Sequence, residues 1–281
     1  MDFLRAAGQF PFLRQVILAS IFLSIVSGLL GTFIVTKRAT YFTGAVAHAV
    51  LGGIGLSRLI SYSFNLGWLD PLRGAIVFSI LFSLLLGLLT IRGREREDTV
   101  VTAMWSVGMA CGVIFMFNTP SSSGDLLGYL FGNVLLLSKR DIYLIAAFCG
   151  IVLSLILLFY RQFVAICFDE EFARARGVRV GFYYTFLLCM FAAGTVLVSV
   201  VAGLLMTVAL LSIPSATANL LVKSLPKMMS LSSLLTFVFI IAGLFVSFQI
   251  DLPSGPTIVI ISVLFYLLSI LLTRCLLRPK T

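Results

Sequence analysis

The chain alternates long apolar runs with short polar connections along almost its entire length. Each run holds about 20 residues, the length of a helix that crosses the hydrocarbon core of a bilayer. Almost all charged residues fall between the runs or at their ends. The pattern predicts membrane-spanning helices over residues 15–36, 41–60, 72–91, 100–118, 141–160, 182–201, 203–222, 230–249 and 256–275.

Two places leave the number of spans open. The sixth and seventh runs abut at Ala202-Gly203, so they form either two tightly turned helices or one broken segment. The semi-apolar stretch from Asp125 to Leu137 has the character of a short re-entrant or interfacial element. We therefore predict an all-α integral membrane protein with about eight or nine transmembrane helices and a short cytoplasmic helix.

Composition excludes a soluble protein. Of the 281 residues, 60% are hydrophobic and 11% are charged, whereas a soluble domain carries about 25% charged residues. The net charge of +9 does not indicate nucleic acid, because basic residues collect in the cytoplasmic loops of membrane proteins. Placing the basic loop 161–181 inside puts most Lys and Arg residues in the cytoplasm, with the N-terminus outside and the C-terminus inside.

The acidic residues lie in loops or at helix ends, and none lies in the middle of an apolar run. Carriers driven by proton or sodium gradients use buried ionisable groups as relays or ion ligands. The pattern therefore argues against such a carrier, and the absence of a GxxxxGK[ST] loop argues against ATP hydrolysis by this chain. We expect a pore-forming subunit, not an enzyme, with energy supplied by another subunit.

His48 is the only histidine of the chain. It is the one ionisable residue that the pattern places well inside an apolar run. Gly44, His48 and Gly52 share one face of a helix, and small residues at this spacing let helices approach closely. His48 should therefore face other helices or a cavity. Two roles remain open: a transient ligand for a transition metal, which neutral imidazole suits, or a packing residue hydrogen-bonded to a neighbouring carbonyl.

The stretch 168–178 predicts a short capped helix outside the membrane. Asp169 is a suitable N-cap with two glutamates after it, two arginines fall in the last turn, and Gly177 suits the left-handed position that ends a helix. Such local order predicts either a rigid element that docks on a partner subunit or a solvated loop helix.

Five segments in this order resemble the membrane permeases of ABC importers for zinc, manganese or iron. The resemblance spans nearly the whole chain. The segments are Lys37–Ala49, Asp125–Asn133 with Asp141, Phe168–Val178, Gly203-Leu204-Leu205 with Ile213–Ala218, and Asp251–Pro256.

The resemblance implies that residues 1–281 form a single permease domain in a prokaryotic cytoplasmic membrane. It implies a second permease chain, identical or not, a cytoplasmic ATP-binding subunit and an extracytoplasmic metal-binding protein. A divalent metal ion would be the cargo, with no permanently bound cofactor. An importer of another cargo, such as a siderophore or a vitamin, is the alternative.

The resemblance also assigns roles to residues. His48 coincides with a histidine that lines the metal path, although Gly44 stands where the family usually has Asp. Apart from the resemblance, Pro214 lacks an N–H and would kink the seventh run, and the kink would either open a cavity or be packed. The residues expected to couple to the ATPase are Phe168, Asp169, Glu170, Glu171, Phe172, Arg174 and Arg176.

Overall fold

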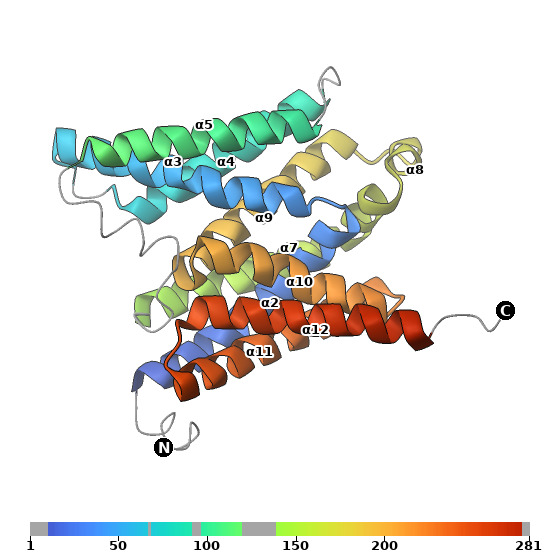
Figure 1. The fold of residues 1–281 in the computed structure, drawn as a ribbon. Coiled ribbons are helices and arrows are strands. Elements are labelled where there is room, and N and C mark those ends of the chain that lie inside the picture. Colours follow the sequence, from blue (N-terminus) through green and yellow to red (C-terminus); the bar gives the residue numbers. More distant parts are fainter. Residues whose placement is uncertain (1–10, 67–68, 92–96, 120–138, 277–281) are drawn as a thin grey trace. The chain divides into compact units, whose positions relative to one another are not determined.

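The computed structural model describes residues 11–66, 69–91, 97–119 and 139–276. Every regular element in these ranges is a helix (Figure 1). The helices are α2 (Pro11–Thr36), α3 (Thr40–Phe64), α4 (Pro71–Ile91), α5 (Glu97–Phe117), α7 (Lys139–Phe168), α8 (Glu170–Ala175), α9 (Val180–Ala202), α10 (Leu204–Leu221), α11 (Leu225–Ile250) and α12 (Ser254–Leu276).

The all-α membrane fold predicted from the apolar runs is confirmed. Each run coincides with a helix, and in the described ranges 8 helices are long and apolar enough to cross a membrane. The sixth and seventh runs are two helices, because Gly203 adopts φ 82° between them, and α10, with 18 residues, is the shortest of the helices that match the apolar runs. The predicted element at Asp125–Leu137 lies outside the described residues.

The chain divides into two compact units, each assembled from separate stretches of sequence. One comprises Met1–Val35, Phe131–Ser154 and Val201–Thr281, and the other comprises Thr36–Leu130 and Leu155–Val200. That the whole chain acts as one permease domain stays a prediction.

In the first unit α10, α11 and α12 lie side by side (Figure 1). The Ser215 hydroxyl on α10 and the Ser232 hydroxyl on α11 lie 2.5 Å apart in the buried interface. Such pairs satisfy polar groups where no water is available. Pro214 lies inside α10 without dividing it into two helices; the kink expected there stays a prediction.

In the second unit α3 packs closely against α4 and α5 (Figure 1). A Cβ atom added to Gly52 would lie 2.7 Å from the Gly108 carbonyl oxygen of α5, and one added to Gly112 would lie 2.6 Å from the Leu51 carbonyl carbon. Glycine is required here because the two backbones are in contact. The small-residue face predicted for this helix is therefore confirmed at Gly52.

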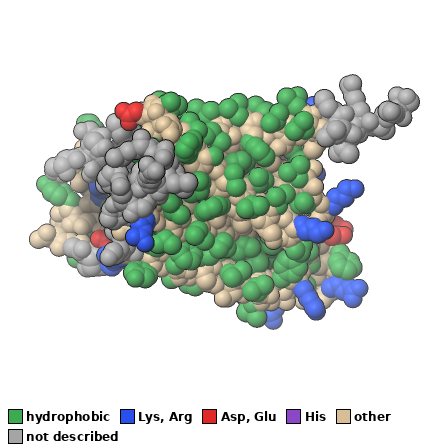
Figure 2. All heavy atoms as spheres, turned by 90° about the horizontal axis from the view of Figure 1, so that it is seen from below, with side chains coloured by type: hydrophobic (Ala, Val, Ile, Leu, Met, Phe, Trp, Pro, Cys, Tyr) green, Lys and Arg blue, Asp and Glu red, His purple; other side chains and the backbone are tan. Residues whose placement is uncertain are grey.

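The surface matches a membrane environment. Figure 2 shows many hydrophobic side chains spread across the middle of the displayed face, where no Lys or Arg side chain appears, and Lys and Arg side chains toward its two ends. Leu81, Leu157 and Leu264 are examples of large side chains that are more than half exposed. Because water would disfavour this much apolar surface, lipid is its natural solvent.

Candidate functional site

The short helix α8 is stabilised at both ends by its own sequence. Asp169 is extended, with φ −153°, and its carboxylate accepts a hydrogen bond of 2.9 Å from the Phe172 amide. At the other end Gly177 adopts φ 79°, and the Val178 amide donates to the Ala173 carbonyl oxygen at 3.0 Å. Both predicted caps are confirmed, and together they hold a six-residue helix that would otherwise be too short to persist.

One face of α8 is buried, and two aromatic side chains are exposed nearby: Phe172 on α8 itself and Phe168 at the end of α7. Ala173 is fully buried, whereas Phe168 and Phe172 are 69% and 53% exposed. The Arg176 guanidinium lies over the Phe172 ring, 5.2 Å from its centroid. Exposed aromatic rings on a rigid helix are typical of a surface that another protein covers.

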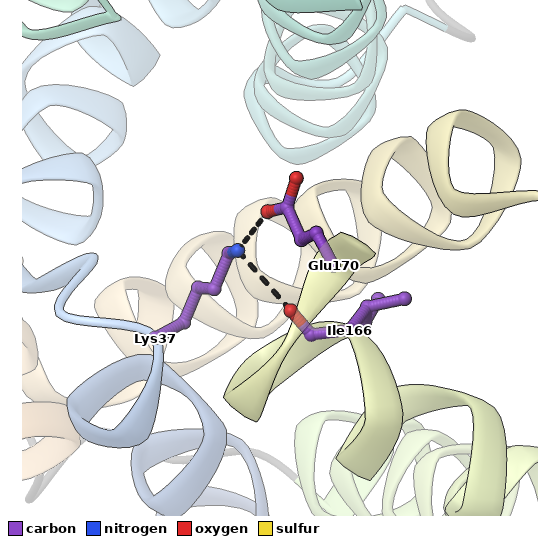
Figure 3. Close-up of polar contacts among 3 residues, drawn as sticks. All are labelled: Lys37, Ile166 and Glu170. Carbon is purple, nitrogen blue, oxygen red and sulfur yellow. Dashed lines mark hydrogen bonds and ion pairs between the residues drawn. The ribbon is translucent and has the colours of Figure 1, made fainter. Parts of the chain in front are cut away.

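Lys37 joins α8 to the connection between α2 and α3 (Figure 3). Its ammonium forms an ion pair with Glu170 and donates a hydrogen bond of 3.2 Å to the carbonyl oxygen of Ile166, near the end of α7. The ammonium also lies 5.4 Å from the centre of the Tyr184 ring. We call this arrangement the Lys37 link. Through this one cation, the end of α7 and the start of α8 are connected to the segment just before α3, all within one compact unit.

The Lys37 link is partly sheltered from solvent. The Lys37 side chain is 18% exposed and the Glu170 side chain 43% exposed. Because water reaches the carboxylate, we expect the ion pair itself to contribute only about 1 kcal/mol. The contact matters more for where it is made. The bonded Ile166 carbonyl is part of the end of α7, where carbonyls lack intrahelical partners.

His48 projects from α3 onto α5. Its ring stacks on Trp105, with ring centres 5.0 Å apart and planes inclined by 15°. The Nδ1 atom is buried and has no hydrogen-bond partner in the described part of the chain. The predicted orientation toward another helix is confirmed, while the neighbouring carbonyl expected for a packing role is not found at Nδ1.

Gly44 leaves free space one turn before His48. A Cβ atom added there would meet no atom within 4 Å. Among the described residues no group of three or more His, Cys, Asp and Glu side chains could hold a metal ion. The His48 imidazole therefore lies beside room for a further ligand.

The predicted site residues are brought together only in part. Asp169, Glu170, Phe172 and Arg176 make the contacts described above, while Glu171 and Arg174 lie exposed on α8. Lys37 and Trp105 were not predicted as site residues. The Lys37-Arg38 pair within the first resembling segment was the only signal for Lys37, and nothing in the sequence pattern marked Trp105.

Residues 9–273 match the model of the ABC 3 transport family. The chain belongs to the ABC 3 transport family. The predicted resemblance is therefore confirmed, and with the apolar helices it makes the chain a multi-pass protein of a prokaryotic cytoplasmic membrane.

Several ABC 3 relatives match over nearly their full length. An uncharacterized membrane protein of Synechocystis is 37% identical, covering 95% of this chain and 92% of the relative. A probable metal transport system membrane protein of Chlamydia pneumoniae is 35% identical, with 90% and 86% covered. The manganese transport system membrane protein MntC of Listeria monocytogenes is 33% identical, with 96% and 94% covered.

A solved structure supports the same fold. A chain of PsaBC from Streptococcus pneumoniae, solved in complex with a Fab, is 31% identical and superposes with a TM-score of 0.82. The superposition covers 95% of this chain and 94% of that one.

Proposed function

We propose that this chain is the permease subunit of an ATP-driven importer of divalent transition metal ions. The observation that carries the proposal is the family match over residues 9–273, supported by relatives described as metal and manganese transport proteins. Manganese is the first metal to test, because the MntC relative aligns over 96% of this chain. Zinc and iron are the other candidates.

Coupling to ATP is assigned to α8. A cytoplasmic ATP-binding subunit would seat α8 in a surface groove, with Phe168 and Phe172 as apolar anchors and Glu171 and Arg174 as charged contacts. Closing and opening of the ATPase pair would move α8 and so bias the pore between outward and inward states. The Lys37 link gives this motion a route to α3, because α3 begins three residues after Lys37.

The metal path is assigned to the His48 face of α3. His48 lies eight residues beyond the start of α3, about 12 Å along its axis. Neutral imidazole is a suitable transient ligand for zinc or iron, and manganese would also need oxygen ligands such as a carboxylate beside it; the unpaired Nδ1 of His48 is compatible with that use. The free space beside Gly44 would let a carboxylate from elsewhere, such as a non-identical second permease chain, complete the coordination.

The assembly follows from these roles. Two permease chains would enclose the pore, two ATP-binding subunits would dock on the cytoplasmic side, and an extracytoplasmic metal-binding protein would deliver the ion. The metal is cargo, so no permanently bound cofactor is needed.

Radiolabelled manganese, zinc and iron uptake should be measured in proteoliposomes holding this chain with its candidate ATPase and binding protein. Wild type should take up at least one of these metals in an ATP-dependent manner. Glu171→Arg should abolish uptake by reversing a charge at the ATPase contact, and His48→Ala should lower uptake while ATP hydrolysis continues.

The negative outcomes are distinct. A complex that hydrolyses ATP but takes up none of the three metals would show that the cargo is different. Uptake unchanged by Glu171→Arg would remove α8 from coupling, and uptake unchanged by His48→Ala would make His48 a packing residue.

A further inference from the structure

A basic pocket lies beside α8, where α7 ends and α9 begins. It encloses about 380 Å³. Its lining includes two arginines, a glutamine and two aromatic side chains: Arg176, Arg179, Gln162, Phe182 and Tyr183. All of these residues belong to one compact unit, and the basic loop that carries the arginines is predicted to face the cytoplasm.

Within the part of the chain that the structure describes, no carboxylate neutralises the charge of this pocket. Neither Arg176 nor Arg179 forms an ion pair with any carboxylate of the described ranges. Arg176 contacts the Phe172 ring through its guanidinium, which leaves its N–H donors available. Two guanidinium groups, the Gln162 amide and the Tyr183 hydroxyl provide a set of donors that suits a phosphate group.

The pocket takes its lining from the facing ends of two candidate spans as well as from the loop between them. Gln162 belongs to the candidate span Arg140–Phe168, and Phe182 and Tyr183 belong to the candidate span Val180–Ser199. Toward the membrane, Leu157 and Leu158 of α7 are 70% and 69% exposed. A ligand in the pocket would therefore have basic groups on one side and apolar helix surface on the other.

Aromatic packing fixes the walls of the pocket. The Phe182 ring stacks on Phe186 with centres 6.1 Å apart, and Phe186 meets Phe159 edge-on at 5.8 Å. Tyr183 contacts Phe159 and Phe163, with ring centres 5.7 and 6.4 Å apart. The aromatic part of the walls is thus held by its own packing, which lowers the entropic cost of binding.

We propose that this pocket binds the phosphate headgroup of an anionic phospholipid from the cytoplasmic leaflet. Basic pockets between membrane helices on the cytoplasmic side recognise such headgroups, and the exposed leucines offer a surface for the acyl chains. The exposed Phe168 and Phe172 rings suit a soluble subunit, whereas the pocket shares only Arg176 with the residues expected to couple to the ATPase and takes Gln162, Phe182 and Tyr183 from the candidate spans.

The test is native mass spectrometry of the full-length chain in complex with its ATPase, delipidated in detergent. Phosphatidylglycerol, phosphatidylcholine and inorganic phosphate are titrated separately. Wild type should bind phosphatidylglycerol in preference to phosphatidylcholine. The double variant Arg176→Gln/Arg179→Gln should bind phosphatidylglycerol about 30-fold more weakly, since each cation near the membrane surface contributes about 1 kcal/mol.

Two controls separate a site from a general charge effect. Lys223→Gln/Lys227→Gln removes the same charge from exposed positions that do not line the pocket, and it should leave phosphatidylglycerol binding within about twofold of wild type. Arg176→Lys/Arg179→Lys keeps the charge and should retain most of the binding. Thermal unfolding of each variant checks that the fold is intact.

Three results would overturn the proposal. Equal phosphatidylglycerol binding by wild type and the glutamine variant would show that the arginines hold no headgroup. Saturation by inorganic phosphate with no preference for phosphatidylglycerol would make the site one for free phosphate. Loss of the ATPase from the glutamine variant, with lipid binding unchanged, would assign the pocket to subunit docking.

Discussion

The segment of α3 around His48 and the short helix α8 belong to the same compact unit but are held by different interactions. α3 is fixed by shape, because Gly52 brings its backbone against Gly108 of α5. α8 is fixed by polar groups, through the Asp169 cap and the Lys37 link. Inside the membrane region contact distance sets the position of a helix, whereas at the cytoplasmic end charge and capping set it.

The largest effect should come from breaking the close packing of α3. Gly52→Val places branched atoms against the Gly108 carbonyl, and we expect it to destabilise the protein by about 3 kcal/mol. The measurement is the free energy of unfolding in detergent.

Gly44→Ala is the matched control, since it lies on the same helix face with no atom within 4 Å of its Cβ position. It should leave stability unchanged or raise it by about 0.5–1 kcal/mol, because alanine favours a helix over glycine. Equal destabilisation by both variants would show that close packing is not what distinguishes the two positions.

Filling the space at Gly44 should change transport. Gly44→Asp places a carboxylate one turn before His48, and we expect about tenfold tighter manganese binding, because a charged ligand adds about 1.5 kcal/mol. The measurement is manganese affinity by equilibrium dialysis, with Gly44→Asn as the uncharged control. Equal affinity in wild type and Gly44→Asp would show that position 44 does not face the metal.

Breaking the Lys37 link should uncouple transport from hydrolysis. Lys37→Met removes both the ion pair to Glu170 and the hydrogen bond to Ile166, and we expect metal uptake per ATP to fall about fivefold, corresponding to about 1 kcal/mol. Uptake and ATP hydrolysis are measured in the same proteoliposomes.

The charge swap Lys37→Glu/Glu170→Lys should recover part of the ratio, because it restores the ion pair but not the bond to the Ile166 carbonyl. High salt should also lower the metal uptake per ATP of the wild type, because salt screens the ion pair. A parallel fall in hydrolysis and uptake would instead indicate that the link only supports the fold.

The smallest effect should come from the cap of α8. Asp169→Ala removes the acceptor of the Phe172 amide and should cost about 1 kcal/mol of local helix stability. Hydrogen exchange of the amides of residues 170–175 is the measurement. Asp169→Asn retains an acceptor and should behave like wild type, so identical exchange in Asp169→Ala would show that the cap is not needed.

Local features were predictable from the sequence. The apolar runs located the helices, and the order Asp169, Glu170, Glu171 followed by Gly177 located α8 with both caps, because each signal lies within a few residues. The apolar run predicted to end at residue 160 ends where α7 has a kink, with non-helical angles at Phe159 (φ −108°, ψ 18°), and a second helical segment follows the kink to Phe168.

Contacts between distant residues were not predictable. Lys37 and Glu170 are 133 positions apart, and His48 and Trp105 lie on different helices. No periodicity relates such residues, since their meeting depends on how whole helices pack. The free space beside Gly44 is likewise a property of the packed helices, because in sequence this glycine resembles the tightly packed Gly52.

The two caps of α8 have a consequence for assembly. A segment that folds only on its partner bears its ordering entropy at the moment of association, which weakens affinity and often slows productive encounter. Because Asp169 and Gly177 already hold α8 as a helix, this entropy is lost when the permease folds and not when the partner binds. Subunit exchange should therefore be governed by diffusion and by the release rate of a rigid helix from its groove.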